Sequence, residues 1–245
     1  MHKNIKKRVY WLSTVLLLCS VNSSVHAEWH GSVKLVSDYI YRGYSKSRGN
    51  PVVQAHLEYE NPDGWFTGVD VSQVRFDDYL NQDRAEMEAQ PFLGWNQNIN
   101  NDWRAVATAK AYIFDNKLFN QRADYAELYA SAHYQDWLSL QFSFAPNAYQ
   151  RNVDTFNYEL NLRRDVLDNL LFSTGLGYYQ AYSLLGHDSL YWNAGFSWFA
   201  TDNLALDVRY IDSSLSTHYH SETTHDEFYP RPQDHQYLFS VSLGF

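Results

Sequence analysis

The sequence predicts an all-β protein, a transmembrane antiparallel up-and-down β-barrel of about twelve strands. Three observations predict it. After Ala27 the chain consists of blocks of about ten residues in which every second side chain is apolar. The connections between these blocks alternate between short and long, and aromatic side chains gather at the block ends. Since a strand turns successive side chains to opposite faces, each block has one apolar face for lipid and one polar face for a lumen.

Twelve alternating blocks follow one another, and each predicts one strand. In the first block, for example, Val33 and Leu35 alternate with Ser32 and Lys34. The apolar side chains have odd numbers in the first five blocks and in the twelfth, and even numbers in the sixth to the eleventh. The blocks are 31–41, 53–59, 65–72, 86–96, 103–113, 125–134, 138–144, 155–163, 170–179, 189–198, 204–210 and 236–245.

The connections between blocks favour a membrane barrel over a soluble sandwich. Short turns are expected at 61–64, 98–102, 134–137, 164–169 and 200–203. Longer polar segments are expected at 42–50, 75–84, 115–123, 145–153, 181–187 and 213–234. Short turns at one end and long loops at the other are typical of outer-membrane barrels, whereas a Greek-key sandwich has crossovers and scattered loop lengths. An even strand count places both termini on the short-turn, periplasmic side.

Aromatic side chains support the same fold. Trp65, Trp103 and Trp137 each open a block directly after a short turn, and Trp198 closes one. Five tyrosines are expected on the apolar face near strand ends: Tyr39, Tyr41, Tyr59, Tyr178 and Tyr210. Amphipathic rings prefer the level of the lipid headgroups, which predicts two aromatic girdles. The alternative is that aromatic residues simply have a high strand propensity.

The first 27 residues have the pattern of a secretory signal peptide. Residues 1–8 carry four basic side chains and no acidic one, residues 9–21 are mostly apolar, and Ala27 offers a small residue for cleavage. A retained amphipathic helix is the alternative. Cys19 is the only cysteine and lies in this leader, so we expect neither disulfides nor thiolate sites in the mature chain. The expected organisation is a signal peptide over 1–27 and one barrel over 28–245.

Charge excludes nucleic acid as a partner. Four of the 19 basic residues and none of the 28 acidic ones lie in the leader, which leaves 15 basic against 28 acidic residues. A chain this acidic is repelled by phosphate backbones. No mature segment is apolar enough for a membrane helix. The expected surroundings are therefore outer-membrane lipid, with small solutes or ions in the lumen.

The polar face carries charges of both signs, and these are the candidate residues of the pore lining and mouth. The basic candidates are Arg42, Arg104, Lys110, Arg163 and Arg209. The acidic candidates are Asp38, Glu58, Glu86, Glu88, Glu127, Glu159 and Asp207. Ion pairs between neighbouring strands would stiffen the wall, whereas solvated charges would form the selectivity lining of an aqueous pore, with a slight preference for cations.

The width of the lumen leaves two functions open. Twelve strands enclose more space than an eight-stranded barrel, which side chains fill, and less than a large porin. Five tyrosines are expected to point inward and narrow it further: Tyr112, Tyr125, Tyr129, Tyr179 and Tyr191. The first function is a channel for passive diffusion of small hydrophilic solutes or ions. The second is a non-conducting structural or receptor barrel whose loops bind a partner or a metal.

One stretch has the pattern S-D-Y-x-x-R-G-x-S-x-S followed by a Pro-x-x-Gln step, formed by Ser37, Asp38, Tyr39, Arg42, Gly43, Ser45, Ser47, Pro51 and Gln54. This pattern resembles the N-terminal motif of the TorF-type porin family. The resemblance implies an outer-membrane channel. Asp38 and Arg42 are four apart on the expected inward face and could pair with each other along the strand or with neighbouring residues. Gly43 permits a bulge or bend where the strand leaves the membrane. This motif is either a structural lock at the mouth or a solute site.

Other chemistry has weaker signals. His218, His220 and His225 lie in one polar loop and could bind a divalent metal, or be solvated. Ser213, Ser214, Ser216 and Ser221 lie near them, but no acyl-enzyme motif surrounds these serines. We therefore expect no enzyme activity and no cofactor, and the sequence does not predict the oligomeric state.

Overall fold

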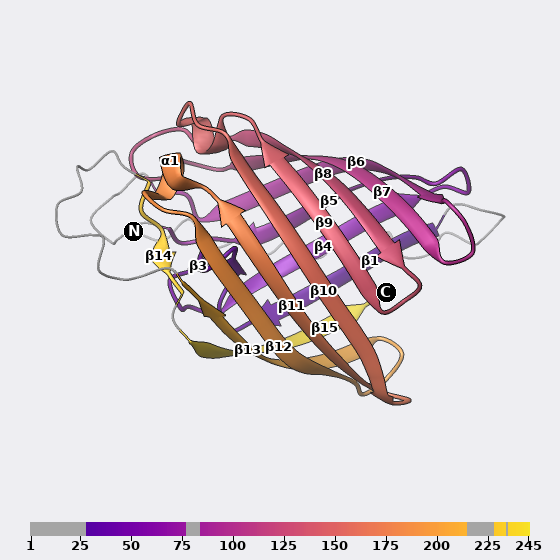
Figure 1. The fold of residues 1–245 in the computed structure, drawn as a ribbon. Helices are drawn as coiled ribbons and strands as arrows, with labels where there is room; N and C mark the ends of the chain where they lie inside the picture. The colour runs from indigo at the N-terminus through magenta and orange to yellow at the C-terminus, as the bar shows by residue number, and fades with distance from the viewer. Residues whose placement is uncertain (1–27, 77–83, 215–227, 234) are drawn as a thin grey trace, which may run out of the picture.

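The computed structural model describes residues 28–76, 84–214, 228–233 and 235–245, and it shows a closed antiparallel barrel of twelve strands (Figure 1). The predicted fold is confirmed. The barrel strands are β1 (Glu28–Val36), β4 (Val52–Glu60), β5 (Trp65–Gln73), β6 (Met87–Asn98), β7 (Trp103–Phe114), β8 (Tyr125–Tyr134), β9 (Leu138–Ala145), β10 (Thr155–Leu167), β11 (Leu170–Gln180), β12 (Ser189–Phe199), β13 (Leu204–Ser213) and β15 (Gln236–Gly244).

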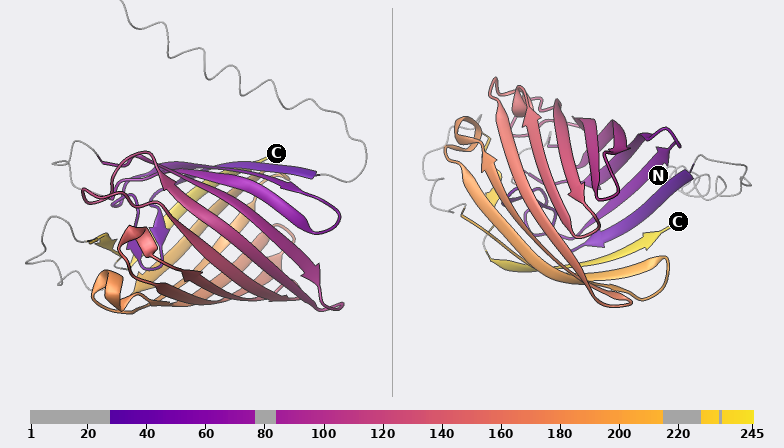
Figure 2. Two further views of the ribbon diagram at one scale, coloured as in Figure 1. Left: turned by 90° about the horizontal axis from the view of Figure 1, so that it is seen from above. Right: turned by 45° about the vertical axis from the view of Figure 1, so that its right-hand side comes forward.

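Each barrel strand pairs with the next one along the chain, and the barrel closes where β1 pairs with β15. The closing register runs from Ser32 opposite Gly244 to Val36 opposite Ser240. Gly31 and Phe245 exchange two backbone hydrogen bonds of 2.9 Å at this seam. The strands are strongly tilted, as all views show (Figure 2). Tilt is what allows a twisted sheet to close on itself.

The connections differ at the two ends of the barrel. At one end, here called the turn end, the strands are joined by the short connections 61–64, 99–102, 135–137, 168–169 and 200–203. At the other, the loop end, they are joined by 37–51, 74–86, 115–124, 146–154, 181–188 and 214–235. The loop end also carries the short helices η2 (Ala148–Gln150) and α1 (Tyr182–Leu185). Within the described residues, the alternation of loop lengths follows the predicted pattern.

Gly64 shows why one of the short turns needs glycine. Its φ is 85°, in the left-handed region, and its N–H donates to the Asn61 carbonyl at 3.0 Å. A Cβ at this position would lie 2.2 Å from the backbone oxygen of Asn96. Both the conformation and the close approach of the neighbouring strand exclude a larger residue there.

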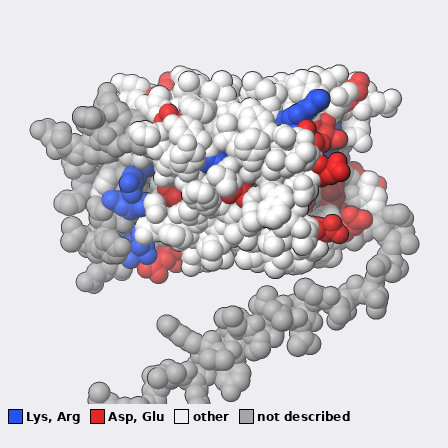
Figure 3. Space-filling view, turned by 90° about the horizontal axis from the view of Figure 1, so that it is seen from below, with Lys and Arg blue, Asp and Glu red and all other residues white. Residues whose placement is uncertain are grey.

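The outer face of the wall is apolar. Leu35, Leu93 and Leu128 are each more than half exposed, and Figure 3 shows a broad uncharged surface around the middle, with charged side chains towards the two ends. Aromatic pairs lie outside at both ends, with ring centroids 5.0 Å apart for Trp103–Tyr134 and 5.4 Å for Tyr210–Tyr237. This arrangement suits a lipid bilayer. No helix in the described ranges has the length and apolar character to cross a membrane.

The first strand is shorter than the predicted block 31–41. It ends at Val36, and residues 37–51, here called the first loop, fold back into the barrel. They contain β2 (Ile40–Tyr41) and β3 (Tyr44–Ser45), which form a small sheet with β14 (Arg231–Pro232). The β2–β3 pair is here called the inner hairpin; β3 is labelled inside the barrel outline in Figure 1.

Arg42 and Gly43 explain this change of direction. They are the two central residues of the inner hairpin, with φ values of 49° and 89°, and Tyr41 pairs with Tyr44 across them. Positive φ at both central positions is the mark of a type I′ turn, which is the tight turn that matches the twist of a two-stranded hairpin. Arg42 therefore lies in a turn and not on a barrel strand.

Candidate functional site

The lumen is the candidate site, and its half next to the loop end, here called the loop half, is filled by the first loop. Tyr44, Ser45, Lys46 and Ser47 are almost completely buried there. The backbone of the loop is fixed from several sides: Lys46 N–H donates to the Tyr39 carbonyl at 2.7 Å, and Arg75 N–H donates to the Lys46 carbonyl at 2.6 Å. The inner hairpin is thus an integral part of the fold.

Two buried ion pairs join the first loop to the barrel wall. Lys46 Nζ lies 2.7 Å from Glu88 Oε2 on β6, and neither side chain is exposed. Arg42 Nη2 lies 2.6 Å from Glu127 Oε1 on β8 and donates to Ser143 Oγ on β9 at 2.7 Å. Buried charges require such partners because desolvation of an unpaired ion is very costly.

Tyrosines complete the surroundings of both carboxylates. Tyr39 donates to Glu88 at 3.2 Å, whereas Tyr41 and Tyr129 donate to Glu127 at 3.0 and 2.7 Å. Predicted outward positions for Tyr39 and Tyr41 are therefore wrong, since both hydroxyls bind luminal carboxylates. The prediction was wrong because it assumed that the alternation of apolar and polar side chains continues past Val36, where the chain leaves the barrel wall.

Lys46 is held among aromatic rings. Its Nζ lies 4.2 Å from the ring centroid of Tyr41 and 5.0 Å from that of Tyr112. Burial lowers the pKa of Lys46, and the Glu88 carboxylate acts in the opposite direction. Cation–π contacts and the ion pair together compensate for the lost hydration of the ammonium group.

An apolar cluster covers the inner hairpin at the loop end. Tyr44 and Tyr149 share a hydrogen bond of 2.7 Å, and the Tyr149 ring stacks on Phe228 at 4.2 Å between centroids. Phe76 and Phe119 pack against Phe228 at 6.1 and 5.4 Å. These five residues, here called the mouth cluster, come from the loops and are all buried.

Of the two alternatives for Asp38 and Arg42, the structure shows pairing with neighbouring residues and not with each other. Asp38 Oδ1 accepts hydrogen bonds from Ser45 and Ser47 at 2.5 and 2.7 Å, and its Oδ2 accepts one from Gln236 at 3.0 Å. Asp38 thus fixes the first loop to itself and to β15, while Arg42 binds Glu127. Neither residue continues β1, which ends at Val36, so the expected shared inward strand face is wrong.

The part of the lumen that the first loop does not fill, here called the turn half, is lined by hydrogen-bonded polar groups. Asp70 accepts from Lys110 at 2.8 Å and lies 2.6 Å from His56 Nδ1. Further along the wall, Arg209 lies 3.2 Å from Asp207. These side chains keep between about a fifth and a third of their surface exposed.

The other candidates are distributed unevenly. Glu159 on β10 accepts from Tyr191 at 2.6 Å inside the lumen. Arg163 lies at the turn end beside Asp136, at 3.6 Å. Glu86 precedes β6 at the loop end and its side chain is 71% exposed, so it does not line the lumen. Glu58 and Arg104 have inward strand positions and no hydrogen bond or ion pair with a described residue.

Some luminal residues were not among the predicted site residues. Lys46 was missed because it lies in a loop, where alternation carries no information about direction. Lys34, His56 and Asp70 have polar-face positions in their alternating blocks, but the sequence of one strand does not show which side chains of other strands approach them. They surround a cavity of about 230 Å³ that is lined by β1, β4, β5 and β6 and by Tyr39 of the first loop, here called the luminal cavity.

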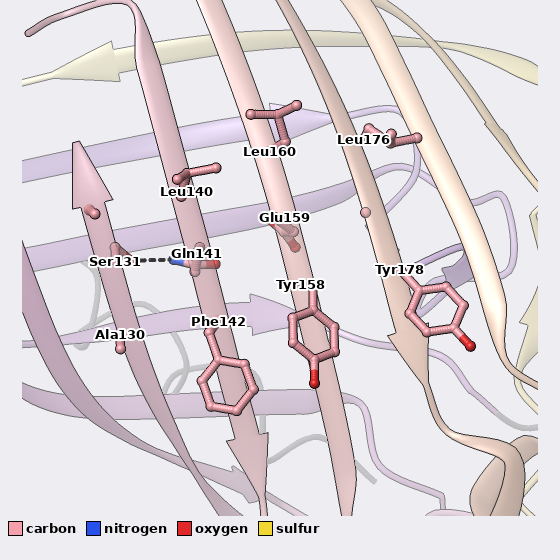
Figure 4. A pocket seen from close by; sticks show the side chains of 12 residues that line it. Ala130, Ser131, Leu140, Gln141, Phe142, Tyr158, Glu159, Leu160, Leu176 and Tyr178 are labelled. Atoms are coloured by element: carbon pink, nitrogen blue, oxygen red, sulfur yellow. Dashed lines mark hydrogen bonds between the residues drawn. The ribbon is translucent and has the colours of Figure 1, made fainter. Parts of the chain in front are cut away.

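A second hollow lies on the outer wall, over β8 to β11, with a volume of about 580 Å³. Figure 4 shows Leu140, Leu160 and Phe142 around it, with Tyr158 and Tyr178 beside them. Gln141, which donates to Ser131 at 3.1 Å, marks the floor. Its apolar rim belongs to the lipid-facing surface.

The proposed metal ligands His218, His220 and His225 lie outside the described residues, as does the leader 1–27. Within the described parts of the chain, no group of three or more His, Cys, Asp or Glu side chains could hold a metal ion.

Residues 21–245 match the model of a family described as "Bacterial protein of unknown function (Gcw_chp)". No curated protein matches the chain.

Solved porin structures have a similar fold. The "KdgM porin" superposes with a TM-score of 0.55 at 11% identity, over 88% of this chain and 99% of that one. A NanC porin structure gives a TM-score of 0.54 at 8% identity, over 88% and 98% of the two chains. KdgM was also solved "in complex with disordered oligogalacturonate", with a TM-score of 0.54 at 10% identity over 89% and 99%. At this identity the likeness is one of fold.

Proposed function

The chain belongs to the Gcw_chp family of bacterial proteins, and we propose that it is an outer-membrane channel for passive diffusion of small hydrophilic solutes or ions. The observation that carries the proposal is the partly exposed polar lining of the turn half of the lumen. There, charged side chains of both signs surround a cavity of about 230 Å³. Polar groups around water inside an apolar wall are the basic requirement of a pore.

Three further features support this function. The barrel has the fold of the KdgM and NanC porins, the first of which was also solved in complex with oligogalacturonate. The first loop and the start of β4 carry the residues that resemble the TorF-type porin motif. The apolar outer wall with its aromatic ends fits a bilayer. In this proposal residues 1–27 direct export and are removed, so that the mature protein begins at Glu28.

The packed loop half favours a second candidate function. With the inner hairpin and the mouth cluster in place, the lumen is obstructed at the loop end, as in a structural or receptor-type barrel whose loops bind a partner. In the channel proposal the same segment narrows the pathway, and solutes pass when it shifts. The two functions differ in whether pure protein conducts.

Planar-bilayer recording of refolded protein distinguishes them. The channel proposal expects discrete conductance steps from the wild type and larger steps from a variant in which residues 38–49 are replaced by a short Gly-Ser linker. A heat-modifiable gel shift controls for folding of both proteins. Absence of steps from folded wild-type protein would overturn the channel proposal and favour the receptor barrel.

A further inference from the structure

The luminal cavity has the geometry of a solute site rather than of a simple gap. Ser32 and Lys34 line it from β1, Gln54 and His56 from β4, and Ser72 from β5. Tyr39 of the first loop forms its boundary on the side of the inner hairpin. An engineered cavity of about 150 Å³ is large enough for benzene, so about 230 Å³ admits a small organic solute.

The charge available to a solute in this cavity is positive. Lys34 is half-buried and makes no hydrogen bond or ion pair with any described residue, although Asp207 attracts and Arg209 repels its charge across the lumen wall. The cavity carboxylate, Asp70, is already engaged by Lys110 and His56. On β13, Asp207 is engaged by Arg209 and Ser197, at 3.2 and 2.7 Å.

The neutral side chains that line the luminal cavity can form hydrogen bonds with the hydroxyl groups of a solute. Ser72 Oγ accepts from Gln54 Nε2 at 3.2 Å, which leaves the serine proton and the Gln54 amide oxygen available. The Ser32 hydroxyl has no partner among the described residues. His56 uses Nδ1 towards Asp70, which leaves Nε2 available. Donors and acceptors thus surround the unpaired ammonium group on adjacent strands.

We propose that the luminal cavity is a binding site for a small hydroxylated carboxylate, with Lys34 binding the carboxylate and Ser32, Gln54 and Ser72 binding hydroxyls. The proposal rests on the proposed channel function, of which it specifies the preferred solute. The lining offers one ammonium group without an ion pair, neutral hydrogen-bonding groups, and one carboxylate, Asp70, that is already paired. This combination selects a compact anion over a neutral or cationic solute, since the wrong solute leaves the ammonium group without a close counter-ion.

Calorimetric titration of refolded protein in detergent with gluconate tests the site. Sorbitol, which has the same hydroxyls without the carboxylate, is the control ligand. We expect gluconate to bind and sorbitol not to bind. Lys34→Met should weaken gluconate binding by about ten- to a hundredfold, the loss expected for one charge-assisted hydrogen bond. Lys34→Arg should retain binding.

Arg104→Met is the matched control variant, because it removes another partnerless luminal cation that does not line the cavity. It should leave gluconate affinity unchanged. Equal binding of gluconate and sorbitol, or equal losses in Lys34→Met and Arg104→Met, would overturn the site. Conductance without gluconate binding would refute the site but not the channel, whereas binding without conductance would refute the channel but not the site.

Discussion

The two halves of the lumen are built on different principles. In the loop half, Glu88 and Glu127 are completely buried and each is paired with a cation from the first loop at 2.6–2.7 Å. In the turn half, the charges on Asp70 and Arg209 remain partly exposed, and Glu58 has no described partner. The loop half is thus packed like a protein core, and the turn half is a solvated lining.

This difference teaches that the inward face of a barrel wall is not a single environment. A carboxylate that water solvates contributes to the electrostatic field of a pore and little to stability. The same residue type covered by a folded loop becomes indispensable, because removing its partner leaves a desolvated charge. Alternation along the strands cannot tell these two situations apart.

The largest expected effect is that of Glu127→Ala. Its carboxylate accepts from Tyr41, Tyr129 and Ser143 and pairs with Arg42, so the substitution leaves a buried guanidinium without its counter-ion. We expect a loss of about 3–5 kcal/mol in the free energy of unfolding, measured by urea titration in lipid vesicles. Glu58→Ala, at a solvated position, is the control, and equal losses in both variants would show that the two halves do not differ.

The pair Lys46–Glu88 should behave as one unit. Lys46→Met and Glu88→Gln should each destabilise the barrel, whereas the double variant should lose less than the sum of the two. The expected coupling is about 1–3 kcal/mol, because each single change leaves one buried partner uncompensated. A double-mutant cycle of urea unfolding measures it, and strictly additive losses would contradict the paired arrangement.

A smaller effect is expected from the mouth cluster. Tyr44→Phe removes the hydrogen bond to Tyr149 and leaves that buried hydroxyl without this partner, a loss of about 1 kcal/mol. Tyr237→Phe, whose side chain is exposed on the outer wall, is the matched control and should unfold like the wild type. A stable Tyr44→Phe variant would mean that the cluster is held by apolar packing alone.

The smallest effect on stability belongs to Glu58→Gln. A half-buried carboxylate with no described partner should change the free energy of unfolding by about 0.5 kcal/mol or less. Its removal should nevertheless shift ion selectivity towards anions, seen as a change of reversal potential in a salt gradient. A decrease in the free energy of unfolding comparable to that of Glu127→Ala would show that Glu58 is packed like the carboxylates of the loop half.

The sequence predicted the wall well because alternation with a period of two directly reports which side chains share a face. It placed Glu88, Glu127 and Lys110 inward, where they lie. It could not predict the partners of Glu88 and Glu127, since Lys46 and Arg42 reach the wall from a loop without periodicity. Tyr39 and Tyr41 continued the odd-numbered apolar pattern, and a tyrosine is equally suited to a membrane surface and to a buried carboxylate. The positive φ of Arg42 allows the tight turn of the inner hairpin, and the only sign of this turn in the sequence is Gly43, which follows it.

The seam between β1 and β15 has a consequence for assembly. Only the beginning and the end of the barrel sequence can close it, so this pairing has the greatest loop-closure cost of all strand pairs. The residues directly after β1 also bridge the seam: Ser37 N–H donates to Phe239 at 2.9 Å, and Gln236 donates to Asp38 at 3.0 Å. Insertion of the inner hairpin and closure of the barrel are therefore coupled events. The first loop, which narrows the mouth, also holds β1 and β15 together.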